Sequence, residues 1–345
     1  VFEGYNGTAY VATGNIGISS SGLGLKIIQG TVIGTTAGDF TGTGNIEMTG
    51  GTYRINVPAA TSIVPQMTGT YTFSGGTVEL NGTAAQTLRG GNFPNTPSYY
   101  NLLSSGTNTV TINNTPIIVS NKFEVNNASA TFDAQNNSVS GNGGVTMSAG
   151  RFRLSKVATT LPELDGISTP YALTGGTIEL YGTSSVQTHS LRGTYNSGAS
   201  NINYYNVDLN SLGANVSPTE ANVVASANFG VQGVMTVNSP TCFKLPSNTT
   251  ISDAGATSTF TLAAGSTLKY GGAIDASGAT GNIRTDVRNF NTTASYGFVG
   301  TVTPQAVGSG LPASMVNMYL DKDAGTQVVT LAGNVTITNE LNLGT

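Results

Sequence analysis

Histidine chemistry in this chain depends on one residue, because His189 is the only histidine. A Ser-His-Asp hydrolase would have to use it as the general base, and no Gly-x-Ser-x-Gly elbow accompanies it. His189 interrupts a stretch whose earlier copy runs directly as Gln86-Thr87-Leu88. We therefore expect an exposed side chain at a bend, with no catalytic role. A metal site built from several histidines is excluded.

Paired carboxylates offer a second kind of acid–base chemistry, since glycoside hydrolysis needs two acids about 5–10 Å apart. Glu79 and Glu179 occupy the middle of equivalent triplets 100 residues apart (179 − 79). Repeated residues of this kind predict outward-facing charges, several coils apart on one face, rather than one active site. Asp321-Lys322-Asp323 is the one local acidic pair and indicates a solvated turn.

Metal and thiol chemistry have little basis in the sequence. The 17 acidic residues are scattered, without the Gly-Gly-x-Gly-x-Asp repeat of calcium-loaded arrays. Cys242 is the only cysteine, so an intrachain disulfide cannot form. It alternates with Phe243 and Leu245, which predicts a buried, unreactive thiol. We expect no catalytic residue, metal or cofactor.

Two tyrosine pairs are the best candidates for ligand binding. Tyr99-Tyr100 and Tyr204-Tyr205 occupy matched places in the two copies of a repeat. An exposed aromatic ring could stack on the face of a sugar. The structural alternative places one tyrosine of each pair in the core and the other over a bend, with its hydroxyl in water. The chain has no Trp, which weakens the sugar-binding hypothesis.

The charge balance excludes some partners. Charged residues make up 9% of the 345 residues, and the net charge is −4 with 13 Lys and Arg. Nucleic-acid binding needs a basic face, so it is not expected. No run of about 18 apolar residues occurs, so no membrane span is predicted in this segment.

Alternating triplets such as Val110-Thr111-Ile112 and Phe123-Glu124-Val125 predict strands with one buried face. Strand starts near 110, 117, 123, 132, 139, 145 and 152 recur about every seven residues, closer than in most sandwiches. Three such strands make a coil of about 20–22 residues. We therefore predict an all-β, triangular parallel β-helix (β-solenoid) with loop insertions. Tandem β-sandwich repeats of about 100 residues are the alternative.

Long internal repeats organise the chain. Gly75-Gly76-Thr77-Val78-Glu79-Leu80 returns as Gly175-Gly176-Thr177-Ile178-Glu179-Leu180. We predict one continuous solenoid over 1–345, with copies at about 44–143 and 144–250 and a degenerate copy at 251–345. The strand-and-turn rhythm continues to the last residue, so we expect an excerpt of a longer chain, packed against neighbouring repeats.

Three phrases resemble known repeats, namely Gly76 to Thr87, Tyr100-Asn101-Leu102 and Gly333 to Leu341. They are similar to the repeats of giant cell-surface adhesins of Bacteroidota, including those used in gliding motility and exported by type 9 secretion. The resemblance covers most of 40–345. It implies an extracellular, cell-surface β-solenoid that contacts external surfaces or polysaccharide, with secretion or gliding machinery as a further partner.

The sequence therefore predicts a non-enzymatic structural and adhesive segment, a rigid stalk of a secreted adhesin or filament. Two alternatives stay open. One is a non-catalytic, carbohydrate-binding β-helix that uses the tyrosine pairs. The other is a β-helical polysaccharide lyase or hydrolase, which would need a cluster of unrepeated acidic and basic residues.

Overall fold

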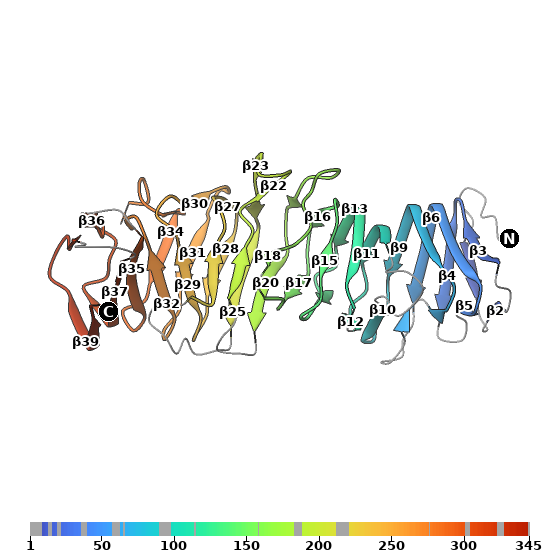
Figure 1. Cartoon of the computed structure of the whole chain (residues 1–345), viewed down its shortest axis with the longest axis horizontal. Helices are drawn as coiled ribbons and strands as arrows, with labels where there is room; N and C mark the ends of the chain where they lie inside the picture. Colours follow the sequence, from blue (N-terminus) through green and yellow to red (C-terminus); the bar gives the residue numbers. More distant parts are fainter. Residues whose placement is uncertain are drawn as a thin grey trace. The chain divides into compact units, whose positions relative to one another are not determined.

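A computed structural model shows strands, turns and bends, and no helix, among the residues that it describes (Figure 1). The described residues are 9–12, 16–18, 22–35, 40–56, 63–64, 66–89, 98–113, 115–157, 159–182, 188–211, 221–275, 277–300, 304–322 and 328–343. None of the described residues belongs to a helix that could span a membrane.

The chain divides into two compact units, the first formed by 1–154 and 162–176 and the second by 155–161 and 177–345. Within each unit, strands of successive coils pair in parallel, as β11 does with β13 and β28 with β31. Sandwiches are built from antiparallel strands. The fold is an all-β parallel β-solenoid of about 11 turns, which confirms the predicted fold class over the sandwich alternative.

Short strands make up both units. Those of the first unit are β1 (Ala9–Ala12), β2 (Ile16–Ile18), β3 (Leu23–Ile27), β4 (Thr31–Thr35), β5 (Phe40–Gly42), β6 (Asn45–Asn56), β7 (Ile63–Val64), β8 (Gln66–Met67), β9 (Tyr71–Leu80), β10 (Gln86–Arg89), β11 (Ser98–Ser104), β12 (Thr109–Asn113), β13 (Ile117–Val125), β14 (Thr131–Asp133), β15 (Val139–Ser140), β16 (Gly144–Met147), β17 (Arg151–Leu154) and β19 (Ala172–Leu173). Those of the second unit are β18 (Thr160–Leu161), β20 (Thr177–Gly182), β21 (His189–Leu191), β22 (Thr194–Tyr195), β23 (Ser200–Asn201), β24 (Asn203–Tyr204), β25 (Asn206–Ser211), β26 (Val223–Ala225), β27 (Phe229–Val231), β28 (Val234–Val237), β29 (Cys242–Leu245), β30 (Ile251–Asp253), β31 (Thr259–Leu262), β32 (Thr267–Tyr270), β33 (Ile283–Arg284), β34 (Val287–Phe290), β35 (Ser295–Gly300), β36 (Gln305–Ala306), β37 (Ser314–Lys322), β38 (Val329–Thr330) and β39 (Thr336–Asn342).

The coils of the second unit repeat a fixed order of three strands. Along the chain, β24, β25 and β26 are followed by β27, β28 and β29, and then by β30, β31 and β32. Equivalent strands pair with one another, giving the series β24-β27-β30-β33, β25-β28-β31-β34 and β26-β29-β32-β35. Each of these coils therefore has three sides, as the predicted triangular cross-section requires.

The core is built from inward-facing residues stacked in register. In the second unit, Phe243 pairs with Leu268, and Leu268 pairs with Tyr296. All three side chains are fully buried. Because side chains alternate along a strand, the residues next to these three within each strand point away from the core. The period-2 triplets of the sequence are thus the physical basis of the fold.

Glycine pairs let long strands turn a corner in the first unit. β6 pairs with β3 along its first half and with β4 along its second half, so this one strand supplies two sides of a coil. The bend lies at Gly50 and Gly51, and the next coil bends at Gly75 and Gly76. Gly51 and Gly76 have φ of +66° and +75°, which disfavours a residue with a side chain. Gly150 adopts the same conformation, with φ of +75°.

Coils average about 24 residues rather than the predicted 20–22. Val78 pairs with Leu102 and Ile178 pairs with Val207, 24 and 29 residues further along the chain (102 − 78; 207 − 178). The prediction counted three short triplets per coil. Strands such as β6 and β9 instead run through a corner without a break and include the bend residues, which lengthens the coil.

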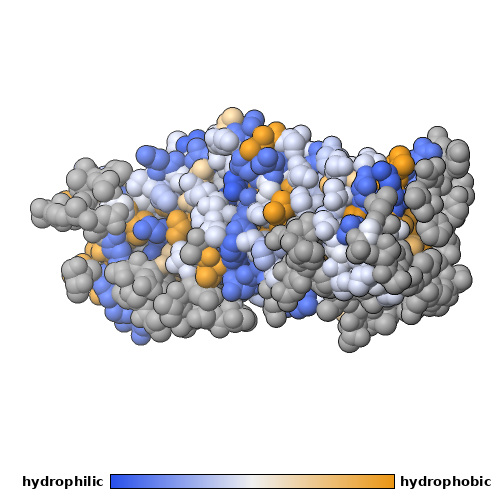
Figure 2. All heavy atoms as spheres, turned by 45° about the vertical axis from the view of Figure 1, so that its right-hand side comes forward, coloured by the Kyte–Doolittle hydropathy of each residue, from blue (hydrophilic) through white to orange (hydrophobic). Residues whose placement is uncertain are grey.

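The described surface is mostly hydrophilic to neutral, with scattered apolar patches in the view of Figure 2. Some of its charges form ion pairs between neighbouring strands or within a strand. Lys26 pairs with Glu47 at 2.9 Å and Lys122 with Glu124 at 2.6 Å. Such exposed pairs contribute at most about 1 kcal/mol each.

Candidate functional site

The two tyrosine pairs have the same arrangement. Tyr99 and Tyr204 are fully buried, whereas Tyr100 is half-buried and Tyr205 is 38% exposed. Tyr204 packs edge-on against Phe229 and donates its hydroxyl to the carbonyl oxygen of Arg192 at 2.6 Å. One ring of each pair therefore belongs to the core. Only Tyr100 and Tyr205 are placed where they could contact a ligand.

A matched pair of substitutions tests this division. Tyr204→Phe is expected to lower the free energy of unfolding by about 1 kcal/mol, because it removes the hydrogen bond from the buried tyrosine to the carbonyl oxygen of Arg192. Tyr205→Phe is expected to change it by less than about 0.5 kcal/mol, since that hydroxyl is at the surface. Equilibrium denaturation of both variants measures the difference. Equal effects would show that the two rings are not divided between core and surface.

Glu79 lies outward on β9, yet it is covered and fully engaged. Its carboxylate accepts hydrogen bonds from Arg54 Nε and Ser105 Oγ, both at 2.7 Å. Glu179, on β20 of the second unit, accepts from Asn210 Nδ2 at 2.9 Å. These carboxylates are 7% and 6% exposed, respectively. Each is therefore held by its own neighbours, and no acid–base pair forms between them.

His189 is fully buried, so the expectation of an exposed residue at a bend is wrong. It begins β21, where it pairs with Val223 and faces the core with Leu191. Its Nδ1 lies 3.0 Å from the carbonyl oxygen of Lys156, and its Nε2 has no hydrogen-bond partner among the described residues. Burial lowers the pKa of the His189 imidazole. The ring is a neutral core residue.

This burial makes the stability of the second unit depend on pH. Below about pH 6.5 the unfolded chain protonates His189 while the folded chain resists protonation. Folding is therefore expected to weaken as pH falls below about 6.5, by at most about 1.4 kcal/mol per pH unit from this residue. His189→Leu should remove that part of the slope in denaturation curves recorded from pH 7.5 to 5. If the free energy of unfolding falls equally with pH in the wild type and in His189→Leu, His189 is not the source of the pH dependence.

Cys242 is buried, as the sequence predicts. Among the described residues, no group of three or more His, Cys, Asp or Glu could hold a metal ion.

Asp321 lies at the end of β37 and not in a solvated turn, so that expectation is wrong; Asp323 is outside the described residues. Its carboxylate pairs with Lys269 Nζ at 2.8 Å, and the two side chains are 6% and 1% exposed. Lys269 lies on β32, and Gly297 of β35 lies between the two strands. A Cβ at Gly297 would clash with the Lys269 side chain at 2.8 Å. The missing side chain therefore lets Lys269 reach across a whole strand.

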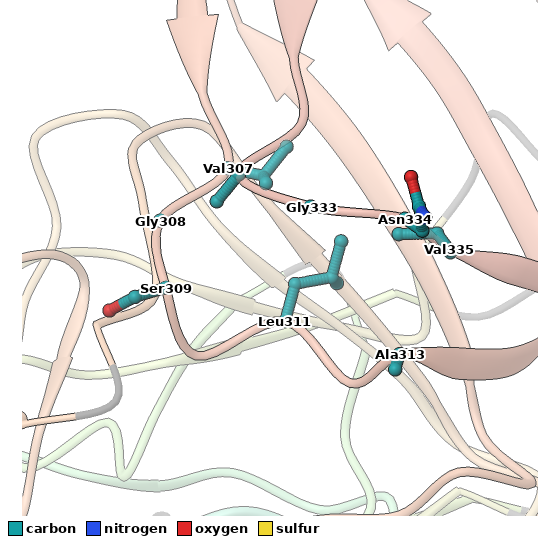
Figure 3. A pocket seen from close by; sticks show the side chains of 9 residues that line it. Val307, Gly308, Ser309, Leu311, Ala313, Gly333, Asn334 and Val335 are labelled. Carbon is teal, nitrogen blue, oxygen red and sulfur yellow. The ribbon is translucent and has the colours of Figure 1, made fainter.

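A small hollow lies among the last strands (Figure 3). Its volume is about 250 Å³, and Val307, Leu311 and Val335 form much of its wall. Leu311 points into this space, whereas Ser309 points away from it and donates to Asp275 at 3.0 Å. None of the described residues that line it has a titratable side chain. The hollow can accept an apolar group but offers no chemistry.

No protein-family model, curated protein or solved structure matches this chain. The fold itself defines the class: the protein is a repeat protein of the parallel β-solenoid type.

Proposed function

We propose that this chain is a structural and adhesive segment of a secreted cell-surface adhesin or filament. It provides a rigid stalk and a polar surface for attachment or gliding. The observation that carries the proposal is that polar side chains form hydrogen bonds between successive coils. Such hydrogen bonds resist separation of the coils and have no catalytic role.

The first unit contains a series of these hydrogen bonds. Asn101 Nδ2 donates to the carbonyl oxygen of Gly76 at 2.9 Å, and Asn121 Nδ2 donates to Asn101 Oδ1 at 2.7 Å. Thr169 Oγ1 then donates to Asn121 Oδ1 at 3.0 Å. Side-chain hydrogen bonds thus join three successive turns at Gly76, Asn101 and Asn121, and the last bond reaches past the next turn to Thr169, in addition to the backbone pairing of the sheets.

The second unit uses the same device. Asn339 Nδ2 donates to Asn317 Oδ1 at 2.7 Å, and Asn317 Nδ2 donates to Ser295 Oγ at 3.0 Å. These bonds are part-buried or exposed, and each of them adds to the rigidity of the stacked coils. A rigid, largely polar solenoid suits an extracellular stalk whose partners are neighbouring repeats, external surfaces or polysaccharide. The resemblance of its repeats to gliding adhesins supports type 9 export and contact with gliding machinery as parts of the same proposal.

A carbohydrate-binding role without catalysis is the second candidate, favoured by the exposed ring of Tyr205. A polysaccharide lyase or hydrolase is less well supported, because Glu79 and Glu179 are already engaged by neighbouring side chains. The proposal therefore treats the chain as a non-enzyme.

Retention under flow tests the adhesive part of the proposal. Beads that carry the folded chain are passed over glass, cells and polysaccharide films, beside beads that carry the heat-unfolded chain. Folded-chain beads are expected to stay attached to at least one surface at shear that removes the control beads. Equal release from every surface would reject adhesion by this segment.

A further inference from the structure

We propose that the second unit binds the carboxylate of an acidic sugar, such as a hexuronate unit of a polysaccharide, in a hollow beside Lys244. The hollow lies on the outer face of the sheet β18-β21-β26-β29-β32-β35-β37-β39. The inference deepens the proposed adhesive function and rests on it for its biological meaning.

The alternation of β29 directs Lys244 outward. Phe243 and Leu245 are fully buried on either side of it. Lys244 pairs with Val224 of β26 on one side and with Lys269 of β32 on the other. Its side chain is half-buried, so the ammonium lies at a surface that is partly shielded from water.

A hollow of about 430 Å³ lies next to this side chain, bordered by Ser247, Pro246 and Val299. The hydroxyl of Ser247 occupies the space that a Cβ at Gly271 or at Gly300 would take, so these two glycines let the serine pack at the border of the hollow. Ligand pockets typically measure roughly 300–1,000 Å³. The hollow is therefore large enough for a sugar unit.

The charge in the hollow is not neutralised by its surroundings. Three other described lysines, Lys26, Lys122 and Lys269, each pair with a carboxylate. Lys244 forms no ion pair with a described residue. Asp321, on β37, is engaged by Lys269, and Lys244 is the charged residue among the described residues that line the hollow.

The other groups at the hollow suit a sugar. Ser247 and Asn248 line it, and their side chains make no hydrogen bond to a described residue. A carboxylate accepts strong, charge-assisted hydrogen bonds from an ammonium, and sugar hydroxyls can bond to the serine and the amide. Val224, Pro246 and Val299 supply apolar surface for the C–H face of a pyranose. The combination fits an acidic sugar better than a neutral sugar or a free inorganic anion.

The net charge of the chain makes the prediction specific. At −4, the molecule as a whole repels polyanions. Binding of an acidic glycan therefore has to come from a local site, and it should depend on one lysine rather than on the sum of all cations.

Calorimetric titration of the chain with a galacturonate trimer tests the site, with the neutral galactose trimer and a sulfated galactose trimer as comparison ligands. The wild type is expected to bind the galacturonate trimer at least about tenfold more tightly than either comparison ligand. Lys244→Met should weaken that binding about tenfold, which corresponds to about 1.4 kcal/mol, and Lys244→Arg should retain most of it. Lys26→Met removes the same charge from the first unit and should leave binding unchanged.

Several results would overturn the proposal. These are wild-type affinity in Lys244→Met, an equal loss in Lys26→Met, or equal binding of the neutral trimer. Tighter binding of the sulfated trimer would show that the hollow recognises a sulfate group rather than a carboxylate, which rejects the assignment. Bead retention on glass or cells is a separate measurement, so loss of this site and loss of the adhesive function can be told apart.

Discussion

Lys269→Met is expected to lower the free energy of unfolding by about 3–5 kcal/mol, the usual cost of removing one partner of a buried ion pair. The ammonium of Lys269 lies 2.8 Å from Asp321 Oδ2, and Asp321 Oδ1 has no hydrogen bond among the described residues. Without the lysine, a carboxylate that is 6% exposed would remain without a counter-charge. Urea denaturation monitored by circular dichroism measures the loss.

A double variant separates the charge from the packing. Lys269→Met combined with Asp321→Leu is expected to recover most of the loss, because an apolar pair can replace a buried ion pair at little cost. Lys122→Met breaks the more exposed pair with Glu124 and should cost no more than about 1 kcal/mol. A loss below about 1 kcal/mol for Lys269→Met, or no recovery in the double variant, would contradict the assignment.

Gly76→Ala is expected to lower the free energy of unfolding by about 3 kcal/mol. At φ of +75° a side chain costs about 1–2 kcal/mol. The new Cβ would also clash with the carbonyl oxygen of Gly50 in the neighbouring coil. A clash with backbone in a packed structure adds about 1–3 kcal/mol. Both penalties arise because the coils stack directly on one another at the corner.

Two other glycines serve as matched controls. Gly198 has φ of +89° but open space around it, so Gly198→Ala should cost only the conformational part, about 1 kcal/mol. Gly333 has open space and no positive φ, so Gly333→Ala should be neutral. Thermal denaturation of the three variants measures the series. If Gly76→Ala lowers the free energy of unfolding no more than Gly198→Ala does, the close contact between coils at this corner is not present.

The fold class follows from the sequence because its causes are local. The alternation in triplets such as Val110-Thr111-Ile112 sets which side chains face the core, independently of distant parts of the sequence. Accordingly, β12 and β17 begin within one residue of the predicted starts at 110 and 152. Coil length is less local. It depends on whether a strand stops at a corner or continues through it, as β6 does at Gly50 and Gly51.

The predicted sites were harder to place because burial depends on neighbours from other coils. The division of each tyrosine pair follows from the alternation of side chains along a strand. The burial of His189 does not, since it depends on Lys156 and Val223 in neighbouring coils. The pairing of Lys269 with Asp321 joins residues 52 positions apart across Gly297, and no spacing in the sequence indicates such a contact.

The central claim is that the chain attaches to surfaces and catalyses no reaction. A quartz crystal microbalance tests this claim most directly. Films of an acidic polysaccharide, a neutral polysaccharide and bare glass are exposed to the chain, and the mass on each surface is followed during binding and washing. The account predicts mass that persists through washing on at least one surface, with the polysaccharide films intact. No retained mass on any surface, or a steady loss of film mass as the polymer is cut, would contradict it.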